Sequence, residues 1–221
     1  MNERYSRQQD IVPRERILET KATIIGVGAI GRQVAIQLTA IGVPYLQLID
    51  YDKVEISNLA SQGYLQSDLE RFKVDATADI CQQINHQLHV EVEKERFKRS
   101  MDVGNSCFIC VDSIETRRHL WNALGDKVNF YVDGRMSAEV LRVITACDGK
   151  SRDYYPQTLF SVEQAHVGPC TAKTTIYCAN IAAGFMLAQF TKYLRLLPVD
   201  ADIQVNLLAS EINVGDIAKI A

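Results

Sequence analysis

The chain has 221 residues, of which 47% are hydrophobic and 23% are charged, and its formal net charge is −3. This composition is typical of a globular protein with one large core, and it predicts a single domain over residues 1–221. The slightly negative charge provides no attraction for nucleic acid or for an anionic membrane, so neither is predicted as a partner.

The first predicted elements form a βαβ unit. Residues 21–26 (KATIIG) are a short apolar strand, and residues 45–50 (YLQLID) are the next strand. Between them, residues 31–43 carry apolar side chains on one helical stripe, and Gly42 is a natural stop for that helix. The whole unit has about the 30 residues expected of such a motif.

Strands and helices continue to alternate beyond this unit. We predict helices over residues 71–85 and 116–126, strands over residues 89–96, 106–112 and 128–133, extended segments over residues 139–148 and 203–209, a long loop over residues 151–170, and a long apolar helix over residues 173–197. This order predicts an α/β fold with a Rossmann-like doubly wound sheet. The sheet is expected to be parallel in its N-terminal half, with an antiparallel C-terminal extension.

The N-terminal residues and the apolar runs indicate where the protein is located. The N-terminal residues are polar, and no apolar run reaches the roughly 20 residues of a membrane span, which predicts a cytoplasmic protein without a membrane segment.

Cys107 and Cys110 form a CxxC within an apolar run, but no second CxxC follows. A structural zinc site needs four ligands, so we predict a buried strand here and no structural zinc.

A glycine-rich turn joins the first strand to its helix. Gly26, Gly28 and Gly31 spell GxGxxG, and Asp50 ends the next strand, 50 − 26 = 24 residues after Gly26. Glycine at these positions allows a tight turn and a close approach of backbone to phosphate, while an acid at the second strand end can accept hydrogen bonds from ribose hydroxyls. The segment therefore predicts adenine nucleotide binding.

Further polar residues favour ATP over a nicotinamide cofactor. Asp52, Ser57, Asn58 and Lys73 follow the second strand, and Asp112 ends a later one. A triphosphate needs a metal ion and basic side chains to offset its charge, whereas a dehydrogenase generally needs only the ribose acid. An NAD-dependent oxidoreductase remains a less favoured alternative.

Five segments in order resemble the ThiF/MoeB/HesA family, the adenylation domains related to ubiquitin-activating enzymes. These segments are RYSRQ (4–8), GVGAIG (26–31), LIDYDKVEISNL (48–59), LERFKVDA (69–76) and CVDSIETR (110–117). The stretch that begins at Cys170 resembles the family's crossover cysteine and the long apolar helix after it. The resemblance covers nearly the whole chain.

The resemblance implies ATP- and Mg2+-dependent adenylation of the C-terminal glycine of a ubiquitin-like or sulfur-carrier protein, with release of pyrophosphate. The residues that it carries over are Gly26, Gly28 and Gly31 along the ATP, Asp50 on its ribose, Asp52 and Asn58 facing the phosphates, Lys73 on the charge that develops at the α-phosphate, and Asp112 holding Mg2+ or orienting the attacking carboxylate.

Two more residues gain a role only through the resemblance. Arg7 looks like the arginine that reaches ATP from a neighbouring subunit, which implies a homodimer. Cys170 is the candidate acceptor for a thioester. Apart from the resemblance, His166 lies four residues earlier and could lower the pKa of that thiol, but a lone loop histidine is more often incidental, and that interpretation is favoured here. A cysteine that only precedes the helix is the alternative.

One position departs from the family pattern. Ser61 stands where the family has a catalytic arginine, and a hydroxyl cannot replace a guanidinium on a phosphate. Arg71 or Arg135 could fill the gap. If neither does, the alternative is a catalytically weakened ATP-binding scaffold or regulatory subunit of such a system.

Overall fold

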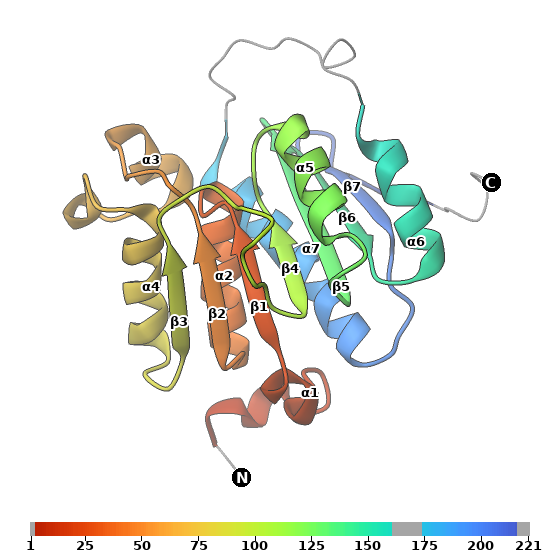
Figure 1. Cartoon of the computed structure of the whole chain (residues 1–221), viewed down its shortest axis with the longest axis horizontal. Coiled ribbons are helices and arrows are strands. Elements are labelled where there is room, and N and C mark those ends of the chain that lie inside the picture. The colour runs from red at the N-terminus through yellow and green to blue at the C-terminus, as the bar shows by residue number, and fades with distance from the viewer. Residues whose placement is uncertain (1–2, 161–173, 216–221) are drawn as a thin grey trace.

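The computed structural model describes residues 3–160 and 174–215. In this part of the chain, one eight-stranded sheet has the order β3-β2-β1-β4-β5-β6-β7-β8 (Figure 1). The strands are β1 (Lys21–Ile25), β2 (Tyr45–Ile49), β3 (His89–Glu93), β4 (Ser106–Ile109), β5 (Phe130–Ser137), β6 (Val140–Ala146), β7 (Asp202–Asn206) and β8 (Glu211–Val214). Strands β1 to β5 pair in parallel, whereas β5 to β8 pair antiparallel, which confirms the predicted fold class.

Helices cover both faces of the sheet. They are α1 (Arg14–Leu18), α2 (Ala29–Ile41), α3 (Ile56–Gln62), α4 (Lys73–Ile84), α5 (Ile114–Leu124), α6 (Gly149–Tyr154) and α7 (Ile176–Leu194), with 3-10 turns η1 (Glu3–Gln8), η2 (Gln66–Asp68) and η3 (Tyr155–Thr158). Helices α2, α4 and α7 contribute to one core cluster, and α5 with η3 to a second. In Figure 1, α2 and α7 lie behind the sheet and α5 in front.

Strand β1 shows why this arrangement follows from the sequence. Ile24 belongs to the core under α2, whereas Ile25 belongs to the core under α5, and both are buried. Successive side chains of a strand point to opposite faces, so a continuous apolar run needs cover on both sides. Helix α2 supplies that cover on one side and ends where predicted, at Gly42, which adopts the left-handed conformation with φ 97°.

The first part of the predicted loop at residues 151–170 is helical. Residues 151–158, expected to be loop, lie in α6 and η3, and Tyr155 is fully buried. Asp148 begins α6, where its Oδ1 accepts a hydrogen bond from the Ser151 N–H at 2.8 Å. An N-cap aspartate of this kind stabilises a short helix that packing then completes. Residues 161–170 of the predicted loop lie outside the described part of the chain.

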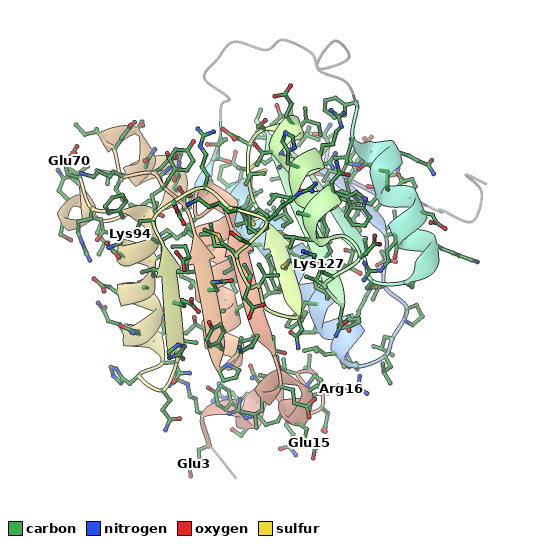
Figure 2. The ribbon with its side chains drawn as sticks, viewed as in Figure 1. Glu3, Glu15, Arg16, Glu70, Lys94 and Lys127 are labelled. Carbon is green, nitrogen blue, oxygen red and sulfur yellow. The ribbon has the colours of Figure 1, made fainter. Side chains whose placement is uncertain are left out.

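Several charged side chains lie on the outside of the fold. Figure 2 labels six of them on separate elements, and all six are exposed: Glu3, Glu15, Arg16, Glu70, Lys94 and Lys127. None of the helices within residues 3–160 and 174–215 has the length and apolarity needed to cross a membrane.

Candidate functional site

Two glycines of the predicted phosphate loop are required by packing. Gly26 follows β1 with φ 87°, and a Cβ atom there would lie 2.7 Å from the Cys110 carbonyl oxygen. A Cβ atom at Gly31 would lie 1.9 Å from the Gly26 carbonyl oxygen. Both distances are too short for any side chain, so these glycines let α2 start directly against β1 and β4.

Gly28 has no such packing requirement. The nearest atom to a Cβ there is the Gln62 Oε1 at 3.7 Å, which is an ordinary contact. Gly28 is also the N-cap of α2 and offers no side-chain cap to the first turn, whose N–H groups lack helical partners. An open glycine at a helix N-terminus is typical of a loop that a phosphate approaches closely.

Asp50 lies beside this loop at the end of β2. Its Oδ2 accepts a hydrogen bond from the Val27 N–H at 2.6 Å, and its Oδ1 accepts one from the Asp52 N–H at 2.9 Å. Burial raises the pKa of Asp50, although both N–H groups and the nearby Lys73 act in the opposite direction. The carboxylate is thus fixed in place next to the loop, where the sequence predicted a ribose ligand.

Lys73 and Asp52 form an ion pair, with Nζ and Oδ2 3.0 Å apart. Two short segments bring them together: the Lys73 N–H donates to the Asp52 carbonyl at 2.9 Å, and Lys53 and Phe72 form an isolated antiparallel bridge. Lys73 is the first residue of α4. The lysine predicted from its segment therefore lies at the tip of β2, with the two aspartates.

Asn58 and Ser61 make their contacts within and around α3. Asn58 Oδ1 accepts from the Glu55 N–H at 3.0 Å, and its Nδ2 lies 3.3 Å from the Ser57 Oγ. Ser61 Oγ donates to the Ser57 carbonyl at 2.9 Å. These contacts are those of a helix that caps itself, and they assign neither side chain to a ligand.

Asp112 follows β4, and its side chain is exposed. Within the described residues it has no hydrogen-bond or ion-pair partner. Mg2+ in nucleotide sites is usually held by one or two carboxylates together with phosphate oxygens and water. A single free carboxylate at the end of a strand neighbouring β1 fits that donor set.

A buried network around Asp133 was not predicted from the sequence. Asp133 on β5 has no exposed surface, and its oxygens lie 2.8 Å from both the Arg117 Nε and the Arg135 Nε. The Tyr155 hydroxyl donates to the same carboxylate at 2.9 Å. Burial alone would raise the pKa of Asp133, but the two guanidinium groups outweigh it and hold that pKa below its usual value.

One candidate for the missing arginine, Arg135, belongs to this network. The two Nη atoms of Arg135 bond Thr158, at 2.8 Å to its carbonyl and 3.0 Å to its hydroxyl. The other candidate, Arg71, is paired with Asp68 at 3.3 Å and Asp79 at 2.5 Å. Both guanidinium groups are thus engaged by other residues in this structure, and their role towards a phosphate stays a prediction.

Arg7 lies far from the loop of its own chain. It belongs to η1, where the adjacent Gln8 donates from Nε2 to the Ile41 carbonyl, at the C-terminal end of α2. The phosphate loop precedes the other end of this 13-residue helix, which is about 20 Å long at a rise of 1.5 Å per residue. Cys170 and His166 lie outside the described residues.

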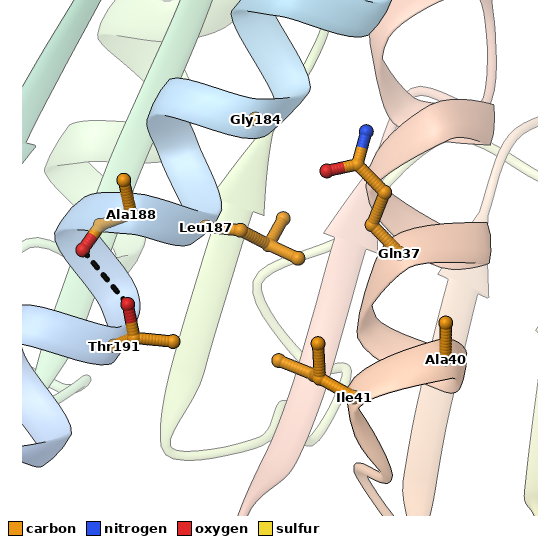
Figure 3. A pocket seen from close by; sticks show the side chains of 7 residues that line it. All are labelled: Gln37, Ala40, Ile41, Gly184, Leu187, Ala188 and Thr191. Carbon is orange, nitrogen blue, oxygen red and sulfur yellow. Dashed lines mark hydrogen bonds between the residues drawn. The ribbon is translucent and has the colours of Figure 1, made fainter. Parts of the chain in front are cut away.

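A shallow hollow of about 290 Å³ lies between α2 and α7. Figure 3 shows its lining, in which mostly small or apolar side chains are joined by the polar Gln37 and Thr191: Gln37, Ala40, Ile41, Gly184, Leu187, Ala188 and Thr191. These α2 residues belong to the half of the helix farthest from Gly28. The hollow is therefore separate from the phosphate loop.

The fold and the loop define a Rossmann-like α/β protein with a glycine-rich turn between β1 and α2. The family model described as "ThiF family" matches residues 5–208, so the chain belongs to the ThiF family. The structure of E. coli MccB with ATP has the same fold, with a TM-score of 0.77 at 17% identity over 98% of this chain and 72% of that chain. PaaA gives 0.75 at 21% identity over 92% of this chain and 66% of that one.

Curated relatives match only part of the chain. Ubiquitin-like modifier-activating enzyme 5 of Caenorhabditis elegans is 30% identical over 139 residues, which are 56% of this chain and 33% of the relative. Molybdopterin-synthase adenylyltransferase of Haemophilus influenzae is 29% identical over 128 residues, or 53% of each protein. The chain thus matches between a third and about half of the length of these relatives.

Proposed function

We propose that the chain uses ATP and Mg2+ to adenylate the C-terminal glycine carboxylate of a ubiquitin-like or sulfur-carrier protein. The observation that carries this proposal is the convergence of Gly28, Asp50 and the Lys73–Asp52 pair at the tips of β1 and β2, in a chain of the ThiF family. The relatives named above as a modifier-activating enzyme and as an adenylyltransferase support the same activity.

The residues of the site would act on the nucleotide from three sides. The loop N–H groups beside Gly28 would bind phosphate oxygens, and Asp50 would accept from the ribose. Lys73 would turn from Asp52 towards the α-phosphate, with Asp52 and Asn58 facing the phosphates. Asp112 would hold Mg2+ or orient the substrate, and the ion would offset the charge of the phosphates.

The reaction would be an in-line displacement at the α-phosphorus. An oxygen of the glycine carboxylate forms the new bond to phosphorus, and the bond to the bridging oxygen breaks as pyrophosphate leaves with its electron pair. Positioning by the loop and charge stabilisation by Lys73 would supply most of the rate enhancement. No proton has to be removed from the attacking carboxylate.

We further propose that the site is completed by a second copy of the chain. The length of α2 separates Arg7 from the loop of its own chain, so Arg7 could reach ATP only from a partner. Mixing Arg7→Ala with Asp112→Ala tests this, because each mixed dimer would contain one intact site. Activity that stays at the level of the separate variants would contradict the shared site.

Cys170 is proposed as the acceptor of the activated acyl group. Transfer would form a thioester and release AMP. A reductant-sensitive adduct with the carrier protein on a non-reducing gel tests this step, and the same adduct formed by Cys170→Ala would exclude Cys170. Because His166 is proposed to lower the pKa of that thiol, His166→Ala should slow adduct formation at neutral pH.

Pyrophosphate exchange into ATP tests the adenylation directly. We expect exchange with small proteins that end in glycine for the wild type, and loss of exchange for Asp112→Ala. The neutral Ser61, bonded to its own helix, favours the scaffold as a second candidate. ATP binding without exchange for any carrier would support that candidate. The single domain over residues 1–221 and the absence of structural zinc stay predictions.

A further inference from the structure

Arg32 is a buried cation next to the phosphate loop. It follows Gly31 in the first turn of α2 and is only 2% exposed. Its Nε donates to the Gly63 carbonyl and its Nη1 to the Thr77 hydroxyl, both at 3.2 Å, and its Cζ lies 4.2 Å from the centroid of the Tyr64 ring. No carboxylate in residues 3–160 and 174–215 forms an ion pair with it.

A second buried arginine, Arg117, has the kind of carboxylate partner that Arg32 lacks among the described residues. Arg117 is 5% exposed and lies 2.8 Å from the Asp133 carboxylate. Charged side chains are almost never buried without a partner, because desolvation costs more than neutral hydrogen bonds return. A carbonyl, a hydroxyl and an aromatic face offset only part of that cost at Arg32. No anionic group among the described residues therefore pairs with the charge of Arg32.

The contacts of Arg32 lead directly to the phosphate loop. The hydroxyl of Tyr64, whose ring lies against Arg32, donates to the Val27 carbonyl inside the loop at 2.5 Å. Gln62, next to Gly63, has a buried Oε1 without a hydrogen-bond partner among the described residues, and this atom lies near Gly28. An unpaired charge and an unpaired amide oxygen thus flank the same loop. The guanidinium of Arg32 points to an anionic group there, whereas the amide oxygen of Gln62 points to a hydrogen-bond donor.

We propose that Arg32 is the positioning residue that offsets the phosphate charge of the bound nucleotide. It would do so from α2, in place of the guanidinium that Ser61 does not provide. Of the function proposed above, this inference requires only that the loop binds ATP. Arg32 would act through Tyr64 and the Gly63 turn, which hold the loop, and through its own charge at the N-terminus of α2.

The test compares ATP with adenosine, because only ATP carries the phosphates. Calorimetric titration of Arg32→Gln should show ATP affinity reduced about tenfold or more, with adenosine affinity unchanged. Arg32→Lys, which keeps the charge, should recover most of the ATP affinity. Arg16→Gln is the control, since Arg16 is an exposed arginine of α1.

Four results would contradict the proposal or the function on which it rests. Equal losses for ATP and adenosine in Arg32→Gln would indicate a purely structural role, and unchanged ATP affinity would exclude any role. A wild type that binds no ATP would contradict the proposed function itself, which distinguishes the two failures. If Arg32→Gln does not fold, Ser61→Arg decides: we expect at most about a threefold gain in ATP affinity, whereas a gain of about tenfold or more would show that the charge was missing.

Discussion

The ammonium group of Lys73 lies 3.0 Å from the carboxylate of Asp52, although 21 positions separate the two residues in the chain. The lysine side chain is 9% exposed and the aspartate side chain 46% exposed. The pair therefore places a largely buried cation at the tip of β2, with its partner open to solvent. In the proposed function, an arriving phosphate would compete with Asp52 for this cation.

Lys73→Met should reduce pyrophosphate exchange by about 10²-fold or more, because a positioned donor to developing charge is typically worth that much. Loss of ATP affinity should be smaller if the lysine acts mainly in the transition state. Lys53→Met is the matched control, since Lys53 lies on the same segment and is exposed. Equal rates for the Lys73 and Lys53 variants would remove Lys73 from the mechanism.

Gly28→Ala should weaken ATP binding with little effect on stability, whereas Gly31→Ala should destabilise the fold. At Gly28 the added methyl group has room, so we expect the free energy of unfolding to change by less than about 1 kcal/mol while ATP affinity falls, because the methyl group enters the space of the phosphates. At Gly31 the methyl group would meet the Gly26 backbone, and a loss of about 1–3 kcal/mol or more is expected.

Denaturant unfolding and calorimetric titration of ATP distinguish these two variants. A Gly28→Ala protein that binds ATP as the wild type does would show that no phosphate approaches this glycine. A stable Gly31→Ala protein would contradict the close packing of α2 on β1.

Asp133→Asn should destabilise the fold by about 3–5 kcal/mol at neutral pH, because it leaves two buried guanidinium groups without their carboxylate. The folded-state pKa of Asp133 is lowered. Its contribution is therefore complete above the unfolded pKa of about 3.9 and is lost as the pH falls through the lower folded value.

Urea unfolding between about pH 2 and 7 checks this sign. The stability difference between wild type and Asp133→Asn should be largest near neutral pH and should shrink only below about pH 4. Asp126→Asn on the exposed turn after α5 is the control and should unfold as the wild type does. A difference that grows towards low pH would contradict the ion-pair network.

Regular elements with strong apolar patterns could be predicted from the sequence. The strand at 21–26 is β1 (Lys21–Ile25), the helix at 31–43 is α2 (Ala29–Ile41), and the antiparallel extension is present as β6 to β8. Helices α3 and α6 were missed because they are short and polar, and capping and packing rather than periodicity hold them.

Site residues that belong to local sequence motifs could be predicted, whereas those that depend on contacts between distant segments could not. Asp50, Asp52 and Lys73 come from local motifs, and the structure brings them together. Asp133 with its arginines, and Arg32 with Tyr64, depend on contacts between separate elements, which one sequence does not show. The available signal for Arg32 was a charged residue in a helix turn that is otherwise apolar.

Calorimetric titration of the wild type with Mg2+-ATP and, separately, with NADH tests the central claim most directly. Our account predicts saturable ATP binding that weakens in Gly28→Ala, and no binding of NADH. Binding of NADH in place of ATP, or no heat from ATP at all, would contradict the assignment of this loop to ATP.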